Sequence, residues 1–506
     1  MIAVSVKGKN ENELIAKINM VPKEADAVEV RLDYANNNQY SKSHNGDSYE
    51  ISKYNKIIGN IINNYKNMWA DKKLIIALRG KKQGGRFEHS DTVKFEVFKK
   101  SIALGADYID MEHDFNLGYI KKLLQYRKNI RAKTKIIISY HNLQNSDADF
   151  DGIYGKLKKY ADAVKIVTYA NKIEDNIKMI NFLKKHRGKK IIGFCMGKSG
   201  SISRILCLKY GSLLTYACLD REETAPGQYT ADELLNAYNI NSVNDKTKVF
   251  AVIGNPVEHS LSPEIHNHCY STFGLNNVFV KIKVEELGSF IRNYRDILSG
   301  FSVTVPHKSG IIKHLNSIEL TAKKIGAVNT VALKNGKFYG YNTDIFGAVR
   351  ALKQKISISG KDVLMFGAGG AGKAIGYGIK DENGRLTIVD RATKKGKVLA
   401  KKLGCDFIPL KKLINIKDSA FDIIINATSA GMKAYESVVP GYMLKKGRVV
   451  FDIVYGNNDT KLIADAKKKK CITIDGKEML LWQAVKQFRL LTGRKAAYSM
   501  LREALP

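Results

Sequence analysis

Short apolar runs alternate with longer amphipathic stretches through the first half of the chain. Eight of these runs are predicted to be strands, and most of the segments between them are long enough for one helix. Strands that alternate with helices in this way predict an α/β fold with an N-terminal (β/α)8 TIM barrel over residues 1–235. The eight runs are 2–6, 27–33, 74–80, 107–112, 135–142, 163–170, 190–197 and 212–219.

One connection in this half is longer than the others. The stretch from Ala35 to Asp71 is rich in Asn, Ser, Lys and Tyr. Because such polar connections usually run over the surface of a domain, we expect a surface insertion near 35–71.

Polar side chains gather near the C-terminal ends of the predicted strands, which is the end of a barrel that carries active sites. In the second run, three charges alternate with apolar residues and therefore share one face. Lys165 lies inside the apolar run D-A-V-K-I-V, where an ammonium is costly to bury without a partner. We therefore predict a catalytic site at the barrel mouth. The side chains concerned are Glu29, Arg31, Asp33, Arg79, His141 and Lys165.

A polar stretch, N-I-N-S-V-N-D-K-T, precedes a second series of strand-like and helix-like segments. We expect a linker at 236–247 and a further α/β domain at 248–345. Within that domain, Asn335-Gly336 has the composition of a two-residue hairpin turn. Another α/β domain is predicted at 346–480, and a terminal segment at 481–506.

A glycine-rich turn follows the strand-like run D-V-L-M-F at 362–366. The spacing is G-x-G-x-x-G, and a second strand-like run, L-T-I-V-D, ends in the acidic Asp390. Glycines in this setting let backbone amides approach a pyrophosphate at a helix N-terminus, so the pattern predicts dinucleotide binding. The loop consists of Gly367, Ala368, Gly369, Gly370, Ala371 and Gly372.

The chain is strongly basic, with 83 Lys and Arg against 49 Asp and Glu and a formal net charge of +34. The basic residues are spread along the whole sequence, and neither an RNA-recognition nor a helix-turn-helix pattern accompanies them. A basic nucleic-acid-binding protein is therefore kept only as an alternative from another class. The same excess of cations favours anionic small substrates.

The cysteine pattern predicts a reduced, cytoplasmic protein without structural zinc or any other metal, because the six cysteines are scattered and never spaced C-x-x-C. No run of eighteen apolar residues is present, so no membrane-spanning helix is expected. The first residues, M-I-A-V-S-V-K-G, have neither a signal-peptide nor a transit-peptide layout.

Several motifs of the second half together resemble shikimate dehydrogenase, from about Lys248 to the C-terminus. They are G-N-P-V-E-H-S-L-S-P (254–263), V-T-V-P-H-K (303–308), G-A-V-N-T (326–330), N-T-D-I-F-G (342–347) and N-A-T-S-A-G-M (426–432). The resemblance implies that Lys308 and Asp344 form the catalytic pair. A lysine beside a carboxylate suits the reaction, because the alkoxide formed by hydride transfer needs a proton and a nearby positive charge.

The same resemblance implies that 248–345 is the substrate-binding domain, that 346–480 binds the nucleotide and that 481–506 is a helix returning to the substrate domain. It also assigns the substrate contacts. Ser260 and Ser262 would hold the substrate carboxylate. Tyr455 would line the site. The contacts to the ring hydroxyls would come from Thr304, Asn329 and Gln483.

The resemblance is less decisive about the cofactor. NADP-using members commonly show Asn-Arg-Thr where this chain has Asp390-Arg391-Ala392. Arg391, with Lys394 nearby, is expected to bind a ribose 2′-phosphate, whereas Asp390 is the residue type that binds the free 2′-hydroxyl of NAD. We predict NADP, and Asp390 keeps NAD open as an alternative. The remaining predicted nucleotide contacts are Thr393, Thr428 and Gly476.

The first half resembles type I 3-dehydroquinate dehydratase over roughly residues 1–235, apart from the expected insertion. The motifs are V-E-V-R-L-D-Y (28–34), A-D-A-V-K-I (161–166), M-G-K-S-G-S-I-S-R (196–204) and T-A-P-G-Q (224–228). The resemblance makes Lys165 the Schiff-base lysine, His141 the proton-transfer group and Arg204 the ligand of the substrate carboxylate. It also implies substrate contacts from Glu29, Arg31, Arg79, Thr224 and Gln228.

One residue departs from the family pattern in the barrel. Gln83 stands where the family usually has a Glu that orients and charge-balances the histidine. A glutamine can form hydrogen bonds but carries no negative charge, so we predict an active but slower dehydratase with a lowered pKa of His141.

The overall prediction is a bifunctional enzyme that dehydrates 3-dehydroquinate and then reduces the product to shikimate with NADPH. Three alternatives stay open within the enzyme class: a weak or inactive barrel beside an active dehydrogenase, a quinate dehydrogenase, and a Schiff-base aldolase barrel. The sequence does not predict the oligomeric state, the rate on quinate or channelling of the intermediate.

Overall fold

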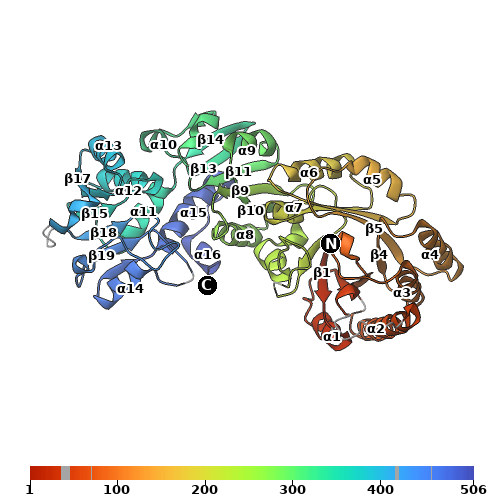
Figure 1. Ribbon diagram of the computed structural model, residues 1–506. Coiled ribbons are helices and arrows are strands. Elements are labelled where there is room, and N and C mark those ends of the chain that lie inside the picture. The colour runs from red at the N-terminus through yellow and green to blue at the C-terminus, as the bar shows by residue number, and fades with distance from the viewer. Residues whose placement is uncertain (36–45, 70, 221, 416–420, 457, 506) are drawn as a thin grey trace. The chain divides into compact units, whose positions relative to one another are not determined.

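The structure is a computed structural model that describes residues 1–35, 46–69, 71–220, 222–415, 421–456 and 458–505. The chain forms two compact units, Met1–Thr247 and Lys248–Pro506 (Figure 1). In the part of the chain that the structure describes, no helix is both long enough and apolar enough to cross a membrane.

The first unit is an eight-stranded parallel sheet in the order β7-β6-β5-β4-β3-β2-β1-β8, which curves into a nearly closed barrel (Figure 1). The Leu213 amide, just before β8, donates to the Ile191 carbonyl at the start of β7 over 2.7 Å and draws the two edges together. The predicted α/β barrel is therefore confirmed. The strands are β1 (Ile2–Lys7), β2 (Ala27–Arg31), β3 (Lys73–Ala77), β4 (Tyr108–Glu112), β5 (Lys135–Asn142), β6 (Ala163–Tyr169), β7 (Ile191–Met196) and β8 (Thr215–Cys218).

Helices connect the strands and cover the outer face of the barrel (Figure 1). Each presents an apolar side toward the sheet, as the sequence pattern indicates. They are α1 (Glu11–Asn19), α2 (Asp47–Met68), α3 (Asp91–Ala103), α4 (Leu117–Asn129), α5 (Phe150–Leu157), α6 (Asp175–Lys185) and α7 (Ser201–Leu206).

The expectation of a surface insertion at 35–71 was wrong for most of its length. Residues 47–68 form α2, which contacts α1 and α3 as a regular helix of the barrel. Tyr54, Ile58, Ile61 and Tyr65 recur at helical spacing and are buried, so the Asn- and Lys-rich composition describes only the outer face. Residues 36–45 and 70 of this prediction lie outside the described residues.

The second unit begins with a six-stranded sheet in the order β10-β9-β11-β13-β14-β12. Strands β13 and β14 form the predicted hairpin, in which Asn335 and Gly336 both have positive φ, as a tight hairpin turn requires. The strands are β9 (Lys248–Gly254), β10 (Asn277–Lys283), β11 (Leu298–Val303), β12 (Ser317–Ile318), β13 (Thr330–Lys334) and β14 (Lys337–Tyr341). The helices are α8 (Ser262–Thr272), α9 (Leu287–Tyr294) and α10 (Leu320–Ile325).

A parallel sheet follows in the order β17-β16-β15-β18-β19-β20, which is the doubly wound order of dinucleotide-binding folds. The strands are β15 (Asp362–Phe366), β16 (Arg385–Asp390), β17 (Asp406–Pro409), β18 (Ile423–Asn426), β19 (Val449–Asp452) and β20 (Ile472–Ile474). The helices are α11 (Asp344–Lys353), α12 (Gly370–Asp381), α13 (Thr393–Leu403) and α14 (Lys461–Lys468).

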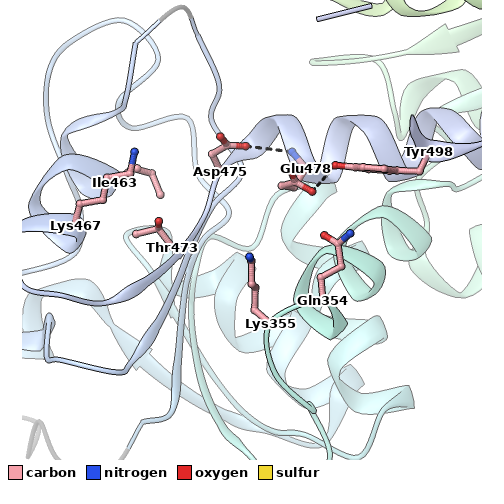
Figure 2. Close-up of a pocket in the computed structure, with 8 residues that line it drawn as sticks. All are labelled: Gln354, Lys355, Ile463, Lys467, Thr473, Asp475, Glu478 and Tyr498. Atoms are coloured by element: carbon pink, nitrogen blue, oxygen red, sulfur yellow. Dashed lines mark hydrogen bonds between the residues drawn. The ribbon is translucent and has the colours of Figure 1, made fainter. Parts of the chain in front are cut away.

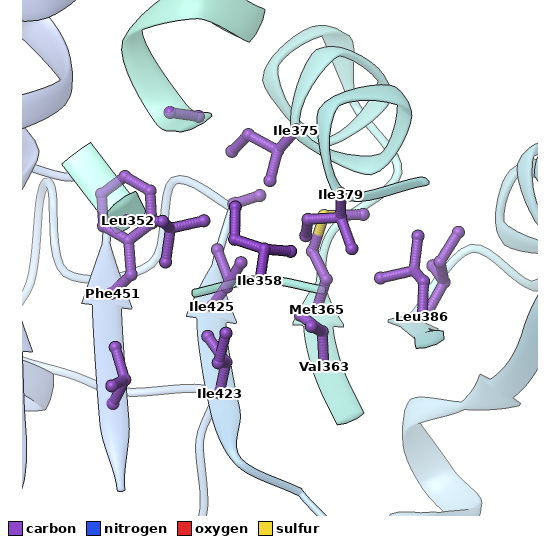
Figure 3. Packing of buried hydrophobic residues seen from close by; sticks show 14 of the residues in the cluster. Leu352, Ile358, Val363, Met365, Ile375, Ile379, Leu386, Ile423, Ile425 and Phe451 are labelled. Carbon is purple, nitrogen blue, oxygen red and sulfur yellow. The ribbon is translucent and has the colours of Figure 1, made fainter. Parts of the chain in front are cut away.

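The core of this sheet consists of aliphatic side chains between the central strands and helices α11 and α12 (Figure 3). Ile423 and Ile425 of β18, with Met365 of β15, pack against Leu352 and Ile379. Because both faces of a parallel sheet are covered, its strands consist of continuous apolar runs.

Two helices end the chain, α15 (Gly476–Thr492) and α16 (Tyr498–Glu503). Leu481, Ala484 and Phe488 of α15 share a core with Phe250 and Phe279 of the first sheet in this unit. Helix α15 therefore begins beside the nucleotide-binding sheet, and its later turns pack against the substrate-binding sheet.

Candidate active sites

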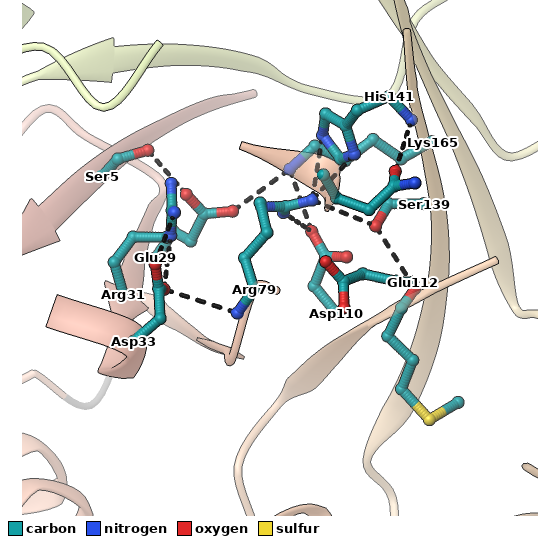
Figure 4. A network of polar contacts seen from close by, with 12 residues as sticks. Ser5, Glu29, Arg31, Asp33, Arg79, Asp110, Glu112, Ser139, His141 and Lys165 are labelled. Atoms are coloured by element: carbon teal, nitrogen blue, oxygen red, sulfur yellow. Dashed lines mark hydrogen bonds and ion pairs between the residues drawn. The ribbon is translucent and has the colours of Figure 1, made fainter. Parts of the chain in front are cut away.

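Lys165 is buried in the barrel between two carboxylates (Figure 4). Its Nζ lies 3.1 Å from Oε1 of Glu29 and 2.9 Å from Oδ2 of Asp110, and it sits 4.0 Å from the centroid of the Tyr216 ring. Strands β2, β4 and β6 supply these three charges. The carboxylates and the aromatic face offset the cost of burying the ammonium.

The cations of the barrel mouth hold both carboxylates in the ionised form. Burial opposes ionisation of Asp110, but Lys165 and Arg79 outweigh it and lower the pKa of the carboxyl to about 2. The pKa of Glu29 is also lowered, because the same cations prevail over burial. Arg79 donates to Oδ2 of Asp110 over 3.0 Å, so one carboxylate joins Lys165 and Arg79.

Asp110 is a site residue that the sequence interpretation missed. It lies in the middle of β4, in the run Y-I-D-M-E, whereas the candidates were sought near strand ends. The available signal was an acidic residue within an apolar, fully buried strand, which is the counterpart of the lysine within β6.

His141 lies on β5 beside the strand that carries Lys165 (Figure 4). Nη1 of Arg79 is 2.8 Å from its Nδ1 and 3.0 Å from its Nε2. Burial, together with the cations of Arg79 and Lys165, lowers the pKa of His141 well below its usual value. The imidazole is therefore neutral and able to accept a proton.

Gln83 does not contact the histidine ring. Its Oε1 accepts a hydrogen bond from the backbone amide of His141 over 2.9 Å, which fastens the β3–α3 loop to β5. The amide adds no negative charge beside the imidazole, and the slower dehydratase expected from Gln83 stays a prediction.

Arg204 is a buried guanidinium that forms no ion pair with a carboxylate among the described residues. It is 1% exposed, lies 4.6 Å from the Phe194 ring centroid, and its Nε and Nη2 have no hydrogen-bond partner among the described residues. Burial lowers its pKa to about 10. Such a cation can accommodate an anionic group.

The other predicted contacts of the barrel are already hydrogen-bonded. Arg31 forms a double hydrogen bond with Asp33, which reaches the mouth from a 3-10 turn immediately after β2. The amide and the hydroxyl of Thr224 donate to Oε1 of Gln228 over 2.9 and 3.1 Å. Both pairs present fixed polar groups.

In the second unit, Lys308 and Asp344 form an ion pair with 2.5 Å between Nζ and Oδ2. Nδ2 of Asn329 donates to the other carboxylate oxygen over 2.8 Å. Gln483 accepts from the Thr343 hydroxyl over 3.0 Å. The structure thus brings together residues from four places: after β11, before β13, at the start of α11 and on α15.

A second cluster involves the predicted carboxylate ligands. The hydroxyls of Ser260 and Ser262 are 3.2 Å apart, at the beginning of α8. Tyr455 lies in the same cluster with its hydroxyl toward Ser260, and burial raises its pKa to about 12. Thr304 packs so closely on Gly254 that a Cβ there would lie 2.3 Å from its methyl group.

The glycine loop has the geometry of a dinucleotide cradle. Gly367 has φ +108°, and a Cβ on Gly372 would lie 2.1 Å from the Gly367 carbonyl oxygen. Gly370 opens helix α12, and a Cβ there would lie 3.4 Å from Cδ of Lys308. The loop therefore borders the Lys308–Asp344 pair directly.

The predicted nucleotide contacts beyond the loop occupy three places. Arg391, Thr393 and Lys394 are exposed around the start of α13. The Thr428 hydroxyl donates to Asn426 over 2.6 Å at the end of β18. Gly476 begins α15, where a Cβ would lie 2.3 Å from the Ile453 carbonyl oxygen.

A separate cavity of about 540 Å³ lies between α11, α14 and α15 (Figure 2). Within it, the Tyr498 hydroxyl donates to Glu478 over 2.6 Å. The cavity contains none of the predicted site residues. Its lining consists of Gln354, Lys355, Ile463, Lys467, Thr473, Asp475, Glu478 and Tyr498.

Comparison with known families gives one match within the first compact unit and three within the second. Residues 2–245 match type I 3-dehydroquinase, and residues 252–331 match the shikimate dehydrogenase substrate-binding domain. Residues 350–478 match shikimate/quinate 5-dehydrogenase, and residues 476–505 match the shikimate 5′-dehydrogenase C-terminal domain.

Individual relatives are similar to most of the chain or to about half of it. The bifunctional 3-dehydroquinate dehydratase/shikimate dehydrogenase, chloroplastic, of Arabidopsis thaliana is 36% identical over 445 residues, 83% of this chain and 73% of the relative. Shikimate dehydrogenase (NADP(+)) of Pyrococcus furiosus is 40% identical over 51% of this chain and 96% of its own length. The crystal structure of shikimate dehydrogenase from Aquifex aeolicus is 36% identical, with a TM-score of 0.49, and covers 52% of this chain and 98% of its own.

Proposed function

The chain belongs to the bifunctional 3-dehydroquinate dehydratase/shikimate dehydrogenase family, and on that premise we propose how its own residues perform the two reactions. The barrel dehydrates 3-dehydroquinate to 3-dehydroshikimate, and the second unit reduces 3-dehydroshikimate to shikimate. The observation that carries the proposal is the buried Lys165 amine, held between Glu29 and Asp110 beside a neutral His141.

The dehydration begins with transfer of a proton from the Lys165 ammonium to water, which frees the amine to attack the C3 ketone of the substrate. Loss of water from the adduct gives an iminium, whose positive charge acidifies the neighbouring C2–H bond. His141 removes that proton and returns it to the departing C1 hydroxyl, which leaves as water. Hydrolysis of the imine releases the product and restores Lys165.

Arg204 is proposed to bind the substrate carboxylate. A bidentate pair would supply partners for the Nε and Nη2 atoms that the rest of the described protein leaves without a hydrogen bond. Glu29, Arg31, Arg79, Thr224 and Gln228 remain the proposed contacts of the ring hydroxyls.

In the second unit, Lys308 is proposed to donate a proton to the ring oxygen, and Asp344 holds the ammonium in place over 2.5 Å. Asn329 orients the carboxylate and, with Thr304 and Gln483, contacts the substrate hydroxyls. Ser260, Ser262 and Tyr455 are proposed to hold its carboxylate. When bound, the nicotinamide supplies the hydride that reduces the ketone.

The arrangement around the glycine loop favours NADP. Oδ2 of Asp390 accepts from the Ala368 amide over 2.7 Å, and Oδ1 accepts from the Ala392 amide over 2.6 Å. Both oxygens already brace the loop, so the carboxylate is poorly placed to select the ribose of NAD. Exposed Arg391 and Lys394 are then the proposed 2′-phosphate ligands, in line with the NADP(+) named for the Pyrococcus furiosus relative.

Two further predictions continue as proposals. The domain limits at 235, 247, 345 and 480 and the cytoplasmic location rest on the sequence pattern and on the resemblance. The scattered cysteines support the location, since thiols of this kind persist in a reducing compartment.

Borohydride trapping tests the dehydratase proposal. Wild-type protein and Lys165→Ala are incubated with 3-dehydroquinate, reduced, digested and mapped by mass spectrometry, with Lys172→Ala as a matched control. We expect the adduct on the peptide containing Lys165 in wild type and Lys172→Ala, and none in Lys165→Ala. Undiminished dehydration by Lys165→Ala would refute the imine mechanism. Oxidation of added NADPH in the same mixture tests the second reaction.

A further inference from the structure

Gln487 is a fully buried amide on α15, one helical turn beyond Gln483 and outside the residues assigned to the site. It is 1% exposed. Its Oε1 is 3.1 Å from Nε2 of His266 on α8, and its Nε2 donates to the Thr330 hydroxyl over 2.9 Å. One side chain thus joins a core histidine to the strand that follows Asn329.

The chain of hydrogen bonds continues to the catalytic pair. The Thr330 hydroxyl donates to Oδ1 of Asn329 over 2.9 Å, and this oxygen also accepts from the Thr343 amide over 2.8 Å. Nδ2 of Asn329 donates to Oδ1 of Asp344 over 2.8 Å. The Thr330 hydroxyl, the Thr343 amide and, over 3.3 Å, the Thr343 hydroxyl all donate to the Asn329 oxygen, so the NH2 group of Asn329 faces the carboxylate.

His266 stands at the far end of this series of hydrogen bonds. The ring is completely buried and stacks on Phe279 with 4.4 Å between centroids. Burial lowers the pKa of His266 to about 4, so the ring is neutral near pH 7. Because Gln487 donates through its nitrogen to Thr330, its oxygen faces His266, and Nε2 of His266 must carry the hydrogen.

We propose that Gln487 and Thr330 are positioning residues that hold the Asn329 amide with its N–H groups toward Asp344. The inference rests on the proposed roles of Lys308 and Asp344. An Asn329 amide turned by half a rotation would place its oxygen against the carboxylate, which repels it. Each hydrogen bond from Gln487 to Asn329 polarises the next donor. Loss of the Thr330 hydroxyl therefore weakens the hydrogen bond from Asn329 to Asp344, although Thr330 does not contact the substrate.

Thr330→Val tests the proposal, because valine keeps the shape and the strand preference but removes the hydroxyl. We expect kcat for 3-dehydroshikimate reduction to fall about tenfold, which corresponds to about 1.4 kcal/mol of activation free energy. The acid limb of the kcat–pH profile should move, whereas KM for NADPH stays unchanged. Thr330→Ser, which restores a hydroxyl, should recover most of the rate. Gln487→Met serves as a second variant, with the same expected direction.

Asn267→Ala is the matched control for a merely structural role. Asn267 is buried on α8, away from Asp344. Its Oδ1 accepts from the Phe279 amide over 2.7 Å, and its Nδ2 donates to the Phe279 carbonyl over 2.9 Å. We expect it to lower Tm without shifting the pH profile. Wild-type kcat and pH profile in both Thr330→Val and Gln487→Met would overturn the proposal, and so would an equal pH shift in Asn267→Ala. Absence of NADPH-dependent reduction in wild type would instead refute the proposed function.

Discussion

Replacing Arg204 by methionine removes the buried guanidinium of the barrel mouth while keeping a long apolar stem in contact with Phe194. Burial lowers the pKa of Arg204 from 12.5 to about 10, which at about 1.36 kcal/mol per pKa unit corresponds to a penalty of about 3 kcal/mol for the charged side chain. Loss of the cation–π interaction with the Phe194 ring offsets about 1 kcal/mol of this gain. We therefore expect Arg204→Met to stabilise the barrel by about 2 kcal/mol.

The stabilisation is measured as a shift of the thermal transition of the barrel. For a unit of this size, about 2 kcal/mol raises Tm by about 4–8 °C. The same substitution removes the proposed ligand of the substrate carboxylate, so kcat/KM for 3-dehydroquinate should fall at least about 30-fold, the equivalent of about 2 kcal/mol. Product formation is followed by the ultraviolet absorbance of the conjugated ketone.

Arg187→Met is the matched control, because Arg187 is about half exposed and forms a surface ion pair with Asp245 over 3.3 Å. Its loss should change Tm and kcat/KM little, as surface ion pairs contribute at most about 1 kcal/mol. A lower Tm in Arg204→Met together with unchanged kcat/KM would refute the reasoning, since the guanidinium would then be a structural cation rather than a charge kept for the substrate.

Three other measurements address the remaining assignments. Gln83→Glu should place a negative charge near His141, raise kcat of the dehydratase and move the acid limb of its pH profile upward; an unchanged profile would contradict the role given to position 83. Arg391→Ser should raise KM for NADPH about tenfold or more and leave KM for NADH unchanged, whereas equal effects on both cofactors would contradict 2′-phosphate binding beside Asp390. His266, whose pKa burial lowers to about 4, binds fewer protons in the folded than in the unfolded state; its contribution is complete above pH 6.5 and is lost as the pH falls toward 4. Urea unfolding of the second unit should therefore lose about 3 kcal/mol over that interval, and His266→Phe should flatten the dependence.

The sequence predicted the architecture because its strands are short, apolar and regularly spaced. All eight barrel strands fall within two or three residues of the predicted runs, and the glycine turn follows β15 as expected. Helix α2 was misjudged because its exposed face is rich in Asn and Lys, and composition averages over faces that helical periodicity separates.

The site was only partly accessible to the same reasoning. Lys165 stood out as a cation in an apolar strand, but its partner Asp110 lies on a strand that is not adjacent to it in sequence or in the sheet, so only the folded barrel shows the pair. Asp390 shows the converse limit. Its residue type indicated NAD. In the structure both of its carboxylate oxygens accept hydrogen bonds from backbone amides, which explains why the side chain does not select the ribose 2′-hydroxyl.

Helix α15 also fixes a distance. Gly476 opens it beside the end of β19, and Gln483 follows seven residues later, which at about 1.5 Å per residue places the two about 10 Å apart along a rigid rod. The helix therefore sets the separation between Gly476 on the cofactor side of the unit and Gln483 on the substrate side. One added residue between them would lengthen the rod by only about 1.5 Å but turn everything beyond it by about 100°, so that Gln483 and Gln487 would leave the site together. The spacing within this helix should consequently tolerate substitution far better than it tolerates insertion or deletion.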